Sequence, residues 1–148
     1  MVLVAYFQDG EGFGCRNLEL LEEIEVITKR GKLPFILLAD FNIEPEEWSK
    51  LAWLERNGAA VIRPEGVEAT CRKGRGTLID YAIVSKNIVP LVKSCQGVPK
   101  VPWAPHIGIR LVISAEPKKV LVRKLMRPRL LVGPAPGEEQ AIGRGAEE

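Results

Sequence analysis

The chain has 148 residues, a length that suits one domain and is short for two. Its composition, 46% apolar and 27% charged, is typical of a globular protein. Twenty-one basic residues against nineteen acidic ones leave a net charge of +2, so net charge alone gives no argument for nucleic-acid binding. The three cysteines are scattered and form no CxxC pair, which excludes a disulfide scaffold and a cysteine zinc site and favours an intracellular, reducing compartment, cytoplasm or nucleus.

The amino terminus predicts a strand. Residues 2–7, VLVAYF, are apolar, and Gln8 and Asp9 end the run at once. The run lacks the basic start and the long apolar centre of a signal peptide, and no stretch of the chain approaches the ~20 apolar residues of a membrane span. We therefore expect neither secretion nor a membrane partner. Because a domain rarely opens on a fully buried strand, we also expect that a further segment belongs upstream of it.

A helix, a strand and a second helix follow in turn. The first helix is expected to begin at Asn17, its N-cap, and to stop at Gly31. The continuous apolar run 33–39, LPFILLA, ends abruptly at an aspartate and suits an interior strand covered on both faces. Pro45 then opens a helix that is expected to end at Gly58. The apolar positions of the two helices are Leu18, Leu21, Ile24 and Ile27 in the first and Trp48, Leu51, Ala52 and Leu54 in the second.

The next part of the chain predicts strands. The turn 72–76, RKGRG, lies among them and holds three basic side chains, which on their own indicate no more than a solvated turn. Residues 1–60 carry six basic and eleven acidic side chains and residues 61–113 carry eight and three, so most positive potential lies in the middle of the chain. With the preceding segments we expect about seven strands and two helices in an α/β architecture. The predicted strands are 59–62, 67–70, 77–85, 91–95 and 107–113.

The composition divides the chain into two parts. Residues 1–113 are expected to form one domain, and residues 114–148 a tail. The tail begins with a basic stretch, 118–129, and continues with Gly, Pro, Ala and Glu, a composition expected to be disordered at its end.

Asp40 and Asn42 are candidate functional residues because they lie just beyond the end of a buried strand. A carboxylate there avoids the cost of burial but is positioned by a rigid element, and open α/β sheets place ligands at the carboxyl ends of their strands. The spacing of two places both side chains on one side of an extended loop. The alternative is that one of them only caps the helix that opens at Pro45.

Asp80 and the single histidine, His106, are the second candidate pair. Asp80 lies within an apolar strand, where an unpaired carboxylate would be costly, so it must face water or find a partner. A carboxylate that holds an imidazole selects its tautomer and suits a histidine that meets a phosphate. The alternative is an aspartate on the solvent face of an edge strand beside a surface histidine.

Four segments together resemble the endonuclease/exonuclease/phosphatase superfamily, which has the deoxyribonuclease-I-like fold. The segment 37–42, LLADFN, is similar to the family's GDFN segment, and the first segment, VLVAYF, is similar to an early strand that carries a Tyr. The segment 77–85, TLIDYAIVS, with Thr70 upstream, is similar to the family's central Asp-Tyr strand. The segment 103–113, WAPHIGIRLVI, is similar to its closing Asp-His strand. The resemblance runs from Val2 to about Ile113. It implies the fold class α/β (α+β), as the C-terminal half of a four-layer α/β sandwich with a mixed β-sheet and two covering helices.

The resemblance also implies roles for individual residues. Asp40 would orient or deprotonate the attacking water, and Asn42 would position the water and the phosphate. His106 would hydrogen-bond the phosphate oxygens, Asp80 would orient His106, and Tyr6 would contact the phosphate. The other residues expected to bind substrate are Thr70, Arg72, Lys73, Arg75 and Trp103.

Several departures from the family pattern bear on activity. The metal-binding Glu and the Asn of the family's first half have no match here, and Pro105 stands where the family has an aspartate before the histidine. Asp40 is therefore the only expected ligand of the implied Mg²⁺ (or Mn²⁺). The chain would then be a truncated piece of a working enzyme or a copy without activity.

Two functions from different classes follow. The first is a Mg²⁺-dependent phosphodiesterase domain acting on nucleic acid, similar to the domains found in non-long-terminal-repeat retrotransposons, with Trp103 stacking on a base and the turn 72–76 holding phosphates. The alternative, which is favoured for Trp103 on its own, is an ordinary, partly buried aromatic residue. The second function is that of a non-catalytic remnant, a nucleic-acid or protein-binding half-domain. Because half of a sandwich leaves one sheet face uncovered, we expect the chain to self-associate or to need its missing N-terminal half.

Overall fold

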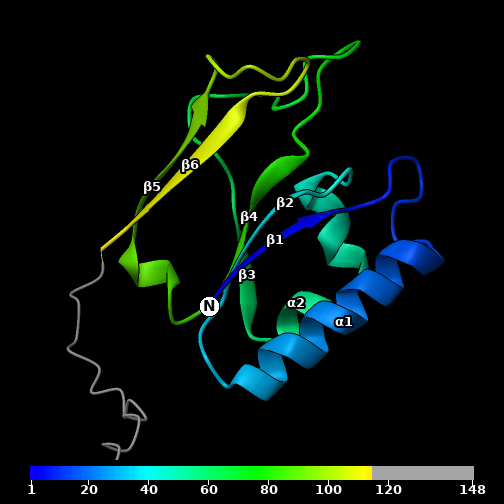
Figure 1. Cartoon of the computed structure of the whole chain (residues 1–148), viewed down its shortest axis with the longest axis vertical. Coiled ribbons are helices and arrows are strands. Elements are labelled where there is room, and N and C mark those ends of the chain that lie inside the picture. Colours follow the sequence, from blue (N-terminus) through cyan, green and yellow to red (C-terminus); the bar gives the residue numbers. More distant parts are fainter. Residues whose placement is uncertain (115–148) are drawn as a thin grey trace, which may run out of the picture. The chain divides into compact units, whose positions relative to one another are not determined.

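The computed structural model of the chain describes residues 1–114, so the predicted tail, apart from Ser114, lies outside the described residues (Figure 1). No helix in the described part has the length and hydropathy needed to cross a membrane. The elements in chain order are β1 (Val2–Tyr6), α1 (Cys15–Gly31), β2 (Ile36–Asp40), the 3₁₀ helix η1 (Pro45–Lys50), α2 (Trp53–Arg56), β3 (Ala59–Ile62), β4 (Asp80–Ser85), the 3₁₀ helix η2 (Val89–Leu91), β5 (Val92–Val98) and β6 (Gly108–Ile113).

The strands form two sheets. The larger sheet has the order β1-β2-β4-β3 and is mixed, because β1 and β2 are parallel and are joined through α1, whereas β4 runs antiparallel to both β2 and β3. The smaller sheet pairs β5 with β6 in antiparallel fashion. Figure 1 shows α1 and α2 on one side of the larger sheet and β5–β6 on the other. The predicted α/β class, with a mixed sheet and two covering helices, is confirmed.

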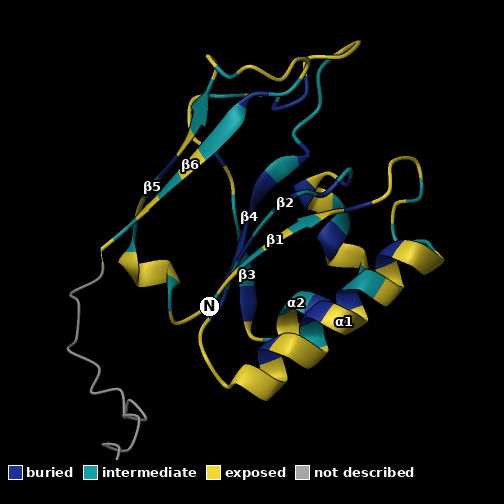
Figure 2. Ribbon diagram, viewed as in Figure 1, coloured by how far each residue is buried: buried dark blue, intermediate teal, exposed yellow. Residues whose placement is uncertain are grey.

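Successive side chains of a strand point to opposite faces of the larger sheet, and buried residues lie on both faces (Figure 2). Side chains of β2 and β4 such as Leu37, Tyr81 and Ile83 pack with α1, η1 and α2 in the main hydrophobic core. Their neighbours Ala82 and Val84, on the opposite face, are also fully buried, and β6 contacts β4 on this side. β4 is therefore the one strand of the larger sheet that is buried on both faces.

The β1 end of the sheet face that carries β5–β6 is exposed to solvent. Val2 and Val4 of β1 are 63% and 81% exposed, and Tyr6 is 61% exposed. β1 is also an edge strand, with β2 as its only partner among the described strands. The prediction of a fully buried first strand is therefore wrong for this chain: only one face of β1 is covered.

Two predicted elements differ from the structure. The helix expected from Pro45 to Gly58 is divided into η1 and α2, because the chain is extended at Leu51 (φ −127°, ψ 127°). The segment 67–70 forms no strand, and β4 begins three residues after Thr77, where the predicted strand was to start. Thr77 instead pairs with Cys71 in an isolated bridge across the turn.

Asn17 has a different role from the predicted helix cap. The N-cap of α1 is Gly14, and Asn17 lies in the first turn with only 1% of its surface exposed. Its amide group donates to the carbonyls of Gln8 (3.1 Å) and Gly12 (2.7 Å), and its oxygen accepts the Gln8 N–H (2.7 Å). Asn17 thus holds the loop between β1 and α1 against the helix.

We predict that Asn17→Ala destabilises the protein by about 1–3 kcal/mol, because it leaves one donor and two acceptors of this loop without their partner. The free energy of unfolding in urea measures the loss. The matched control is Asn87→Ala, since Asn87 is exposed and makes no side-chain hydrogen bond within residues 1–114. Equal effects of the two substitutions would contradict the proposed role of Asn17.

Candidate active site

Three strand ends bring the candidate residues together. In the sheet register Tyr6 lies opposite Asp40, and Asp40 lies opposite Asp80. Since paired residues point to the same face of a sheet, the three side chains project together from the face that carries β5–β6. Asp40 ends β2 and Asp80 begins β4, so both carboxylates lie at the rim of the sheet and are only partly buried. The prediction that Asp80 lies inside a strand is corrected to its first residue.

His106 completes the cluster from another part of the chain. Its Nδ1 lies 2.9 Å from Asp80 Oδ2, and its Nε2 lies 3.9 Å from Asp40 Oδ2. A carboxylate can only accept, so Nδ1 carries the proton and Nε2 is directed toward Asp40. The side chains of Asp40, Asp80 and His106 are 20%, 16% and 27% exposed. The predicted pairing of Asp80 with His106 is confirmed.

Thr70 joins the two partners through the backbone. Its hydroxyl oxygen accepts the N–H groups of Ile79 (3.0 Å) and Asp80 (2.8 Å), and its carbonyl accepts the N–H of Ile107 (2.8 Å). Thr70 is fully buried. The expectation that it contacts substrate is therefore wrong for this structure, and Thr70 is a positioning residue that holds the Asp80 and His106 segments together.

Asp40 and Asn42 form a tight loop at the end of β2. The Asn42 N–H donates to Asp40 Oδ1 (3.2 Å), and the Asn42 amide donates to the carbonyl of Phe7 (2.8 Å). Asn42 has a left-handed backbone (φ 48°), which asparagine tolerates better than most residues. Neither residue caps the helix at Pro45, whose N-cap is Glu44 without a side-chain hydrogen bond. The capping alternative is thereby excluded.

The pKa of Asp40 is raised above its ordinary value. Burial is the main cause, because it removes water from the carboxylate, and the negative charge of Asp80 adds to it. The Asn42 N–H and His106 act in the opposite direction and only partly offset these effects, and Asp9 raises the pKa slightly further. A carboxylate whose pKa is raised is a stronger base once it is ionised.

The raised pKa of Asp40 predicts a stability effect. An acid whose pKa is higher in the folded than in the unfolded chain stabilises the fold below its unfolded pKa, and this contribution is lost as pH rises through the folded pKa. Asp40→Asn removes the charged form, so without divalent metal the variant should melt at a higher temperature than the unsubstituted protein at pH 7. The difference should vanish near pH 3. A lower melting temperature at pH 7 would contradict this assignment.

A cavity of about 410 Å³ lies over these residues. Of the predicted site residues, Asp80 and Thr70 do not line it, and those that do are Tyr6, Asp40, Asn42, Lys73 and His106. Arg72, Arg75 and Trp103 are exposed but do not line it. Trp103, at 57% exposed, is not the partly buried aromatic of the alternative reading.

The turn 72–76 reaches this cavity because two hydrogen bonds close it at its base. Cys71 and Thr77 exchange both backbone hydrogen bonds (2.9 Å each), and Cys71 also bridges to His106. Lys73 is thereby placed in the cavity wall. Lys73 and Gly74 of this turn thus line the cavity, whereas Arg72 and Arg75 are exposed outside it.

Asp9 also lines the cavity, although it is not among the predicted site residues. It follows β1 as Asp40 ends β2, and these two strands are parallel neighbours. Polar residues after adjacent parallel strands meet at one edge of a sheet, so this placement was a usable signal.

The donor set fits a hard divalent ion. One ligand atom each from Asp40, Asp80 and His106 lie within 4.8 Å of one another. Asp80 is already engaged by His106, which leaves Asp40 as the carboxylate free to bind. Mg²⁺ in proteins commonly takes one or two carboxylates and completes its shell with water and substrate phosphate, and Mn²⁺ accepts the same oxygen donors.

Comparisons with known proteins bear on the fold. No protein-family model matches the sequence, and no curated protein does. The endonuclease domain of TRAS1, a telomere-specific non-LTR retrotransposon, matches 76% of this chain and 56% of its own, with a TM-score of 0.58 and 14% identity. A 3′-5′ exonuclease, NExo from Neisseria meningitidis, matches 77% of this chain and 61% of its own, with a TM-score of 0.54 and 20% identity.

A further match is the structure of the 3′ phosphatase NExo from Neisseria bound to a product DNA hairpin, with a TM-score of 0.54 and 18% identity. This chain therefore spans 56% to 61% of the length of these structures. The predicted resemblance to the endonuclease/exonuclease/phosphatase fold is confirmed at the level of the fold.

Proposed function

We propose that this chain, which has the endonuclease/exonuclease/phosphatase fold, hydrolyses phosphodiester bonds of nucleic acid with the help of Mg²⁺ or Mn²⁺. The observation that carries the proposal is the convergence of Asp40, His106 and Asp80. This convergence supports the proposal because a carboxylate that would act as a base lies beside an imidazole whose other nitrogen is held by a second carboxylate.

The chemistry follows from the geometry of these groups. Asp40 would take a proton from a water molecule whose oxygen attacks phosphorus, and Asn42 would help to position that water. As the new phosphorus–oxygen bond forms, the bond to the departing ester oxygen breaks, and that oxygen takes a proton from solvent. Asp80 would accept from Nδ1–H, and His106 in its imidazolium form would donate Nε2–H to the non-bridging oxygens. Tyr6 lines the cavity and is largely exposed, and it would contact the phosphate.

A divalent ion would be held by Asp40, by water and by the phosphate oxygens of the substrate. When bound, it neutralises the charge that develops on the phosphoryl oxygens. It would also offset the repulsion between the charges of Asp40 and Asp80, which is a physical reason to expect metal binding beside Asp40.

Nucleic acid is the proposed substrate class because the approach to the site is basic. Lys73 lines the cavity, and Arg72 and Arg75 are exposed on the same turn. Trp103 is exposed near the start of the His106 segment and offers a ring for base stacking. The similar structures, an endonuclease domain of a retrotransposon and a phosphatase bound to a DNA product, favour DNA as the first substrate to test. The three free cysteines fit an intracellular location.

Nicking of supercoiled plasmid by the full chain, with Mg²⁺ or Mn²⁺ and with a chelator as control, tests the proposal. We expect metal-dependent nicking. The second candidate function, a non-catalytic nucleic-acid or protein-binding half-domain, is suggested by Pro105, which supplies no carboxylate beside His106. Binding of a labelled duplex without any metal-dependent nicking would favour that function and would contradict the enzymatic one.

We also propose that a further protein layer covers the open face of β1. Val2 and Val4 are apolar and largely exposed, and one edge of β1 has no partner strand among residues 1–114. We predict that the chain self-associates at micromolar concentration, which sedimentation velocity would detect, unless a segment corresponding to the remainder of the similar structures takes this place. Val4→Lys should shift the chain toward the monomer because it places a charge on the face. A monodisperse monomer with a reversible melt would contradict the prediction.

A further inference from the structure

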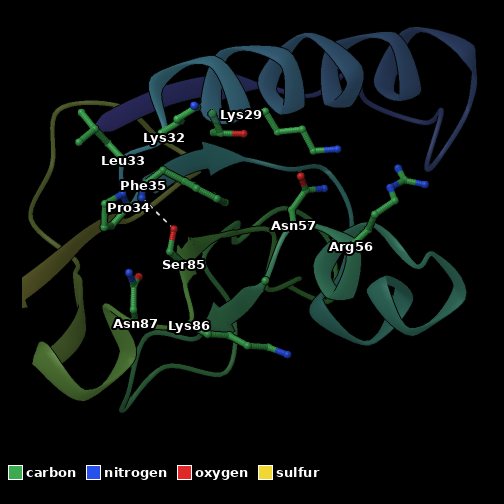
Figure 3. A pocket seen from close by; sticks show the side chains of 12 residues that line it. Lys29, Lys32, Leu33, Pro34, Phe35, Arg56, Asn57, Ser85, Lys86 and Asn87 are labelled. Atoms are coloured by element: carbon green, nitrogen blue, oxygen red, sulfur yellow. Dashed lines mark hydrogen bonds between the residues drawn. The ribbon is translucent and has the colours of Figure 1, made fainter.

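A second cavity, of about 480 Å³, lies at the other end of the larger sheet (Figure 3). It forms where α1 ends, β2 and β3 begin and β4 ends. β2 separates it from Asp40 by about 13 Å, the length of a five-residue strand. A small ligand in one cavity therefore cannot touch the other. We call this cavity the basic pocket and define it by its four basic lining residues, Lys29, Lys32, Arg56 and Lys86.

All charged residues that line the basic pocket are positive. None of its twelve lining residues is acidic. Outside the lining, the Glu25 carboxylate pairs with Lys29 and Arg56, which holds these two side chains in place and lowers the pKa of Glu25. Lys32 and Lys86 have no carboxylate within 4 Å among residues 1–114. Two of the four charges thus remain for an external anion.

Helix stabilisation explains only part of this cluster. Basic residues at the C-terminus of α1 interact favourably with the helix dipole, which accounts for Lys29. Arg56 likewise lies in the last turn of α2, whereas Lys86 follows the end of β4, where no such explanation applies. Lys32 occupies the left-handed C-terminal position of α1 (φ 47°), where glycine is the residue without strain. A lysine at this position adds a charge to the pocket in spite of the backbone it must adopt.

The pocket also has an apolar wall. Leu33, which is 60% exposed, Pro34 and the buried Phe35 line the side next to β2, and Figure 3 shows them apart from Arg56 and Lys86. Asn87 is exposed in the lining and offers amide donor and acceptor atoms. The volume falls in the range of small-molecule sites. A phosphate ion alone would interact with the basic side chains but would make no contact with the apolar wall.

We propose that the basic pocket binds a nucleoside phosphate, with the phosphoryl group between Lys32 and Lys86 and the base against Leu33 and Pro34. The same chemistry is present in a free mononucleotide and in the phosphorylated 5′ end of a nucleic-acid strand. The site is separate from the candidate active site and does not depend on the proposed hydrolysis.

Nuclear magnetic resonance on the full chain tests the proposal. Titration with adenosine 5′-monophosphate should give saturable shifts of the amides of Gly58, Lys86 and Asn87, whereas inorganic phosphate should bind more weakly. The double variant Lys32→Ala/Lys86→Ala should weaken binding at least about tenfold, because both free charges are lost. The matched control is Lys93→Ala/Lys100→Ala, which removes the same net charge from exposed positions outside the pocket and should leave binding within about twofold.

An oligonucleotide with and without a 5′ phosphate distinguishes the two sources. Tighter binding of the phosphorylated strand than of the mononucleotide indicates a strand end, and the reverse order indicates a free nucleotide; both support the pocket. Shifts confined to residues 71–75 and His106, no saturable shift at Lys86, or equal weakening by both double variants would overturn it. Asp40→Ala should leave this binding unchanged, so a failure of the nicking assay would not be confused with a failure here.

Discussion

Plasmid nicking by Asp40→Ala is expected to fall by about 10²- to 10⁴-fold relative to the unsubstituted chain, because the substitution removes the only proposed base and the free metal-binding carboxylate. Asp40→Asn should lose as much activity while keeping an acceptor for the Asn42 N–H, so that its loop geometry is retained. Initial rates of conversion of supercoiled to nicked plasmid measure both variants. Their circular dichroism spectra should match that of the parent chain.

The matched control for Asp40 is Asp9→Asn. Asp9 is an acidic lining residue of the same cavity, but it is exposed and acts on Asp40 only weakly through its charge. We expect less than about a tenfold change in nicking from this substitution. If Asp9→Asn abolishes nicking and Asp40→Asn does not, the base has been assigned to the wrong carboxylate.

Trp48→Ala is expected to destabilise the protein by about 3–5 kcal/mol, the usual cost of removing a large buried aromatic side chain. Trp48 is 2% exposed and packs against Phe13, Phe41 and Trp53. Its indole N–H donates to the hydroxyl of Tyr81 (2.6 Å), which in turn donates to the carbonyl of Ile43 (2.9 Å). Since the free energy of unfolding of a domain is typically ~5–15 kcal/mol, this loss should leave the variant partly unfolded at a temperature where the parent chain is folded.

Urea denaturation followed by circular dichroism measures the effect of Trp48→Ala, and Trp103→Ala is the control. Trp103 is 57% exposed and contacts no other aromatic ring within the described chain. Its removal should change stability by less than about 0.5 kcal/mol. A similar loss for both substitutions would mean that the core around η1 and α2 does not carry the stability that its burial implies.

Two tryptophans explain why the helix predicted from Pro45 to Gly58 is divided. Trp48 and Trp53 are both buried in the main core, but on a continuous helix residues five apart point about 140° from each other. The extended backbone at Leu51 turns α2 so that Trp53 also faces the core. The prediction relied on Trp48, Leu51, Ala52 and Leu54, whose spacing fits a helix, and did not include Trp53, which tertiary packing also buries in the core.

Asn17 shows the same limit for a polar residue. In the sequence it has the features of an N-cap, because it precedes an apolar helical pattern. The structure places it one turn later, buried, with its amide bound to the loop that follows β1. Asn17 bonds to Gln8 and Gly12 because the loop brings their backbone groups to its side chain, and no local sequence pattern predicts this loop conformation.

Several features of the site can be predicted from the sequence: the strands at either side of it, the position of Asp40 and Asn42 at the end of one of them, and the need of Asp80 for a partner such as His106. These features are local: an apolar run, its end, and a charge that cannot remain unpaired in it. Other features depend on how the segments pack: Asp40 lies opposite Asp80, buried Thr70 holds Asp80, and the basic pocket forms. Each depends on the register and crossing of segments far apart in the chain, and a shift of one residue in that register would turn these side chains to the other face.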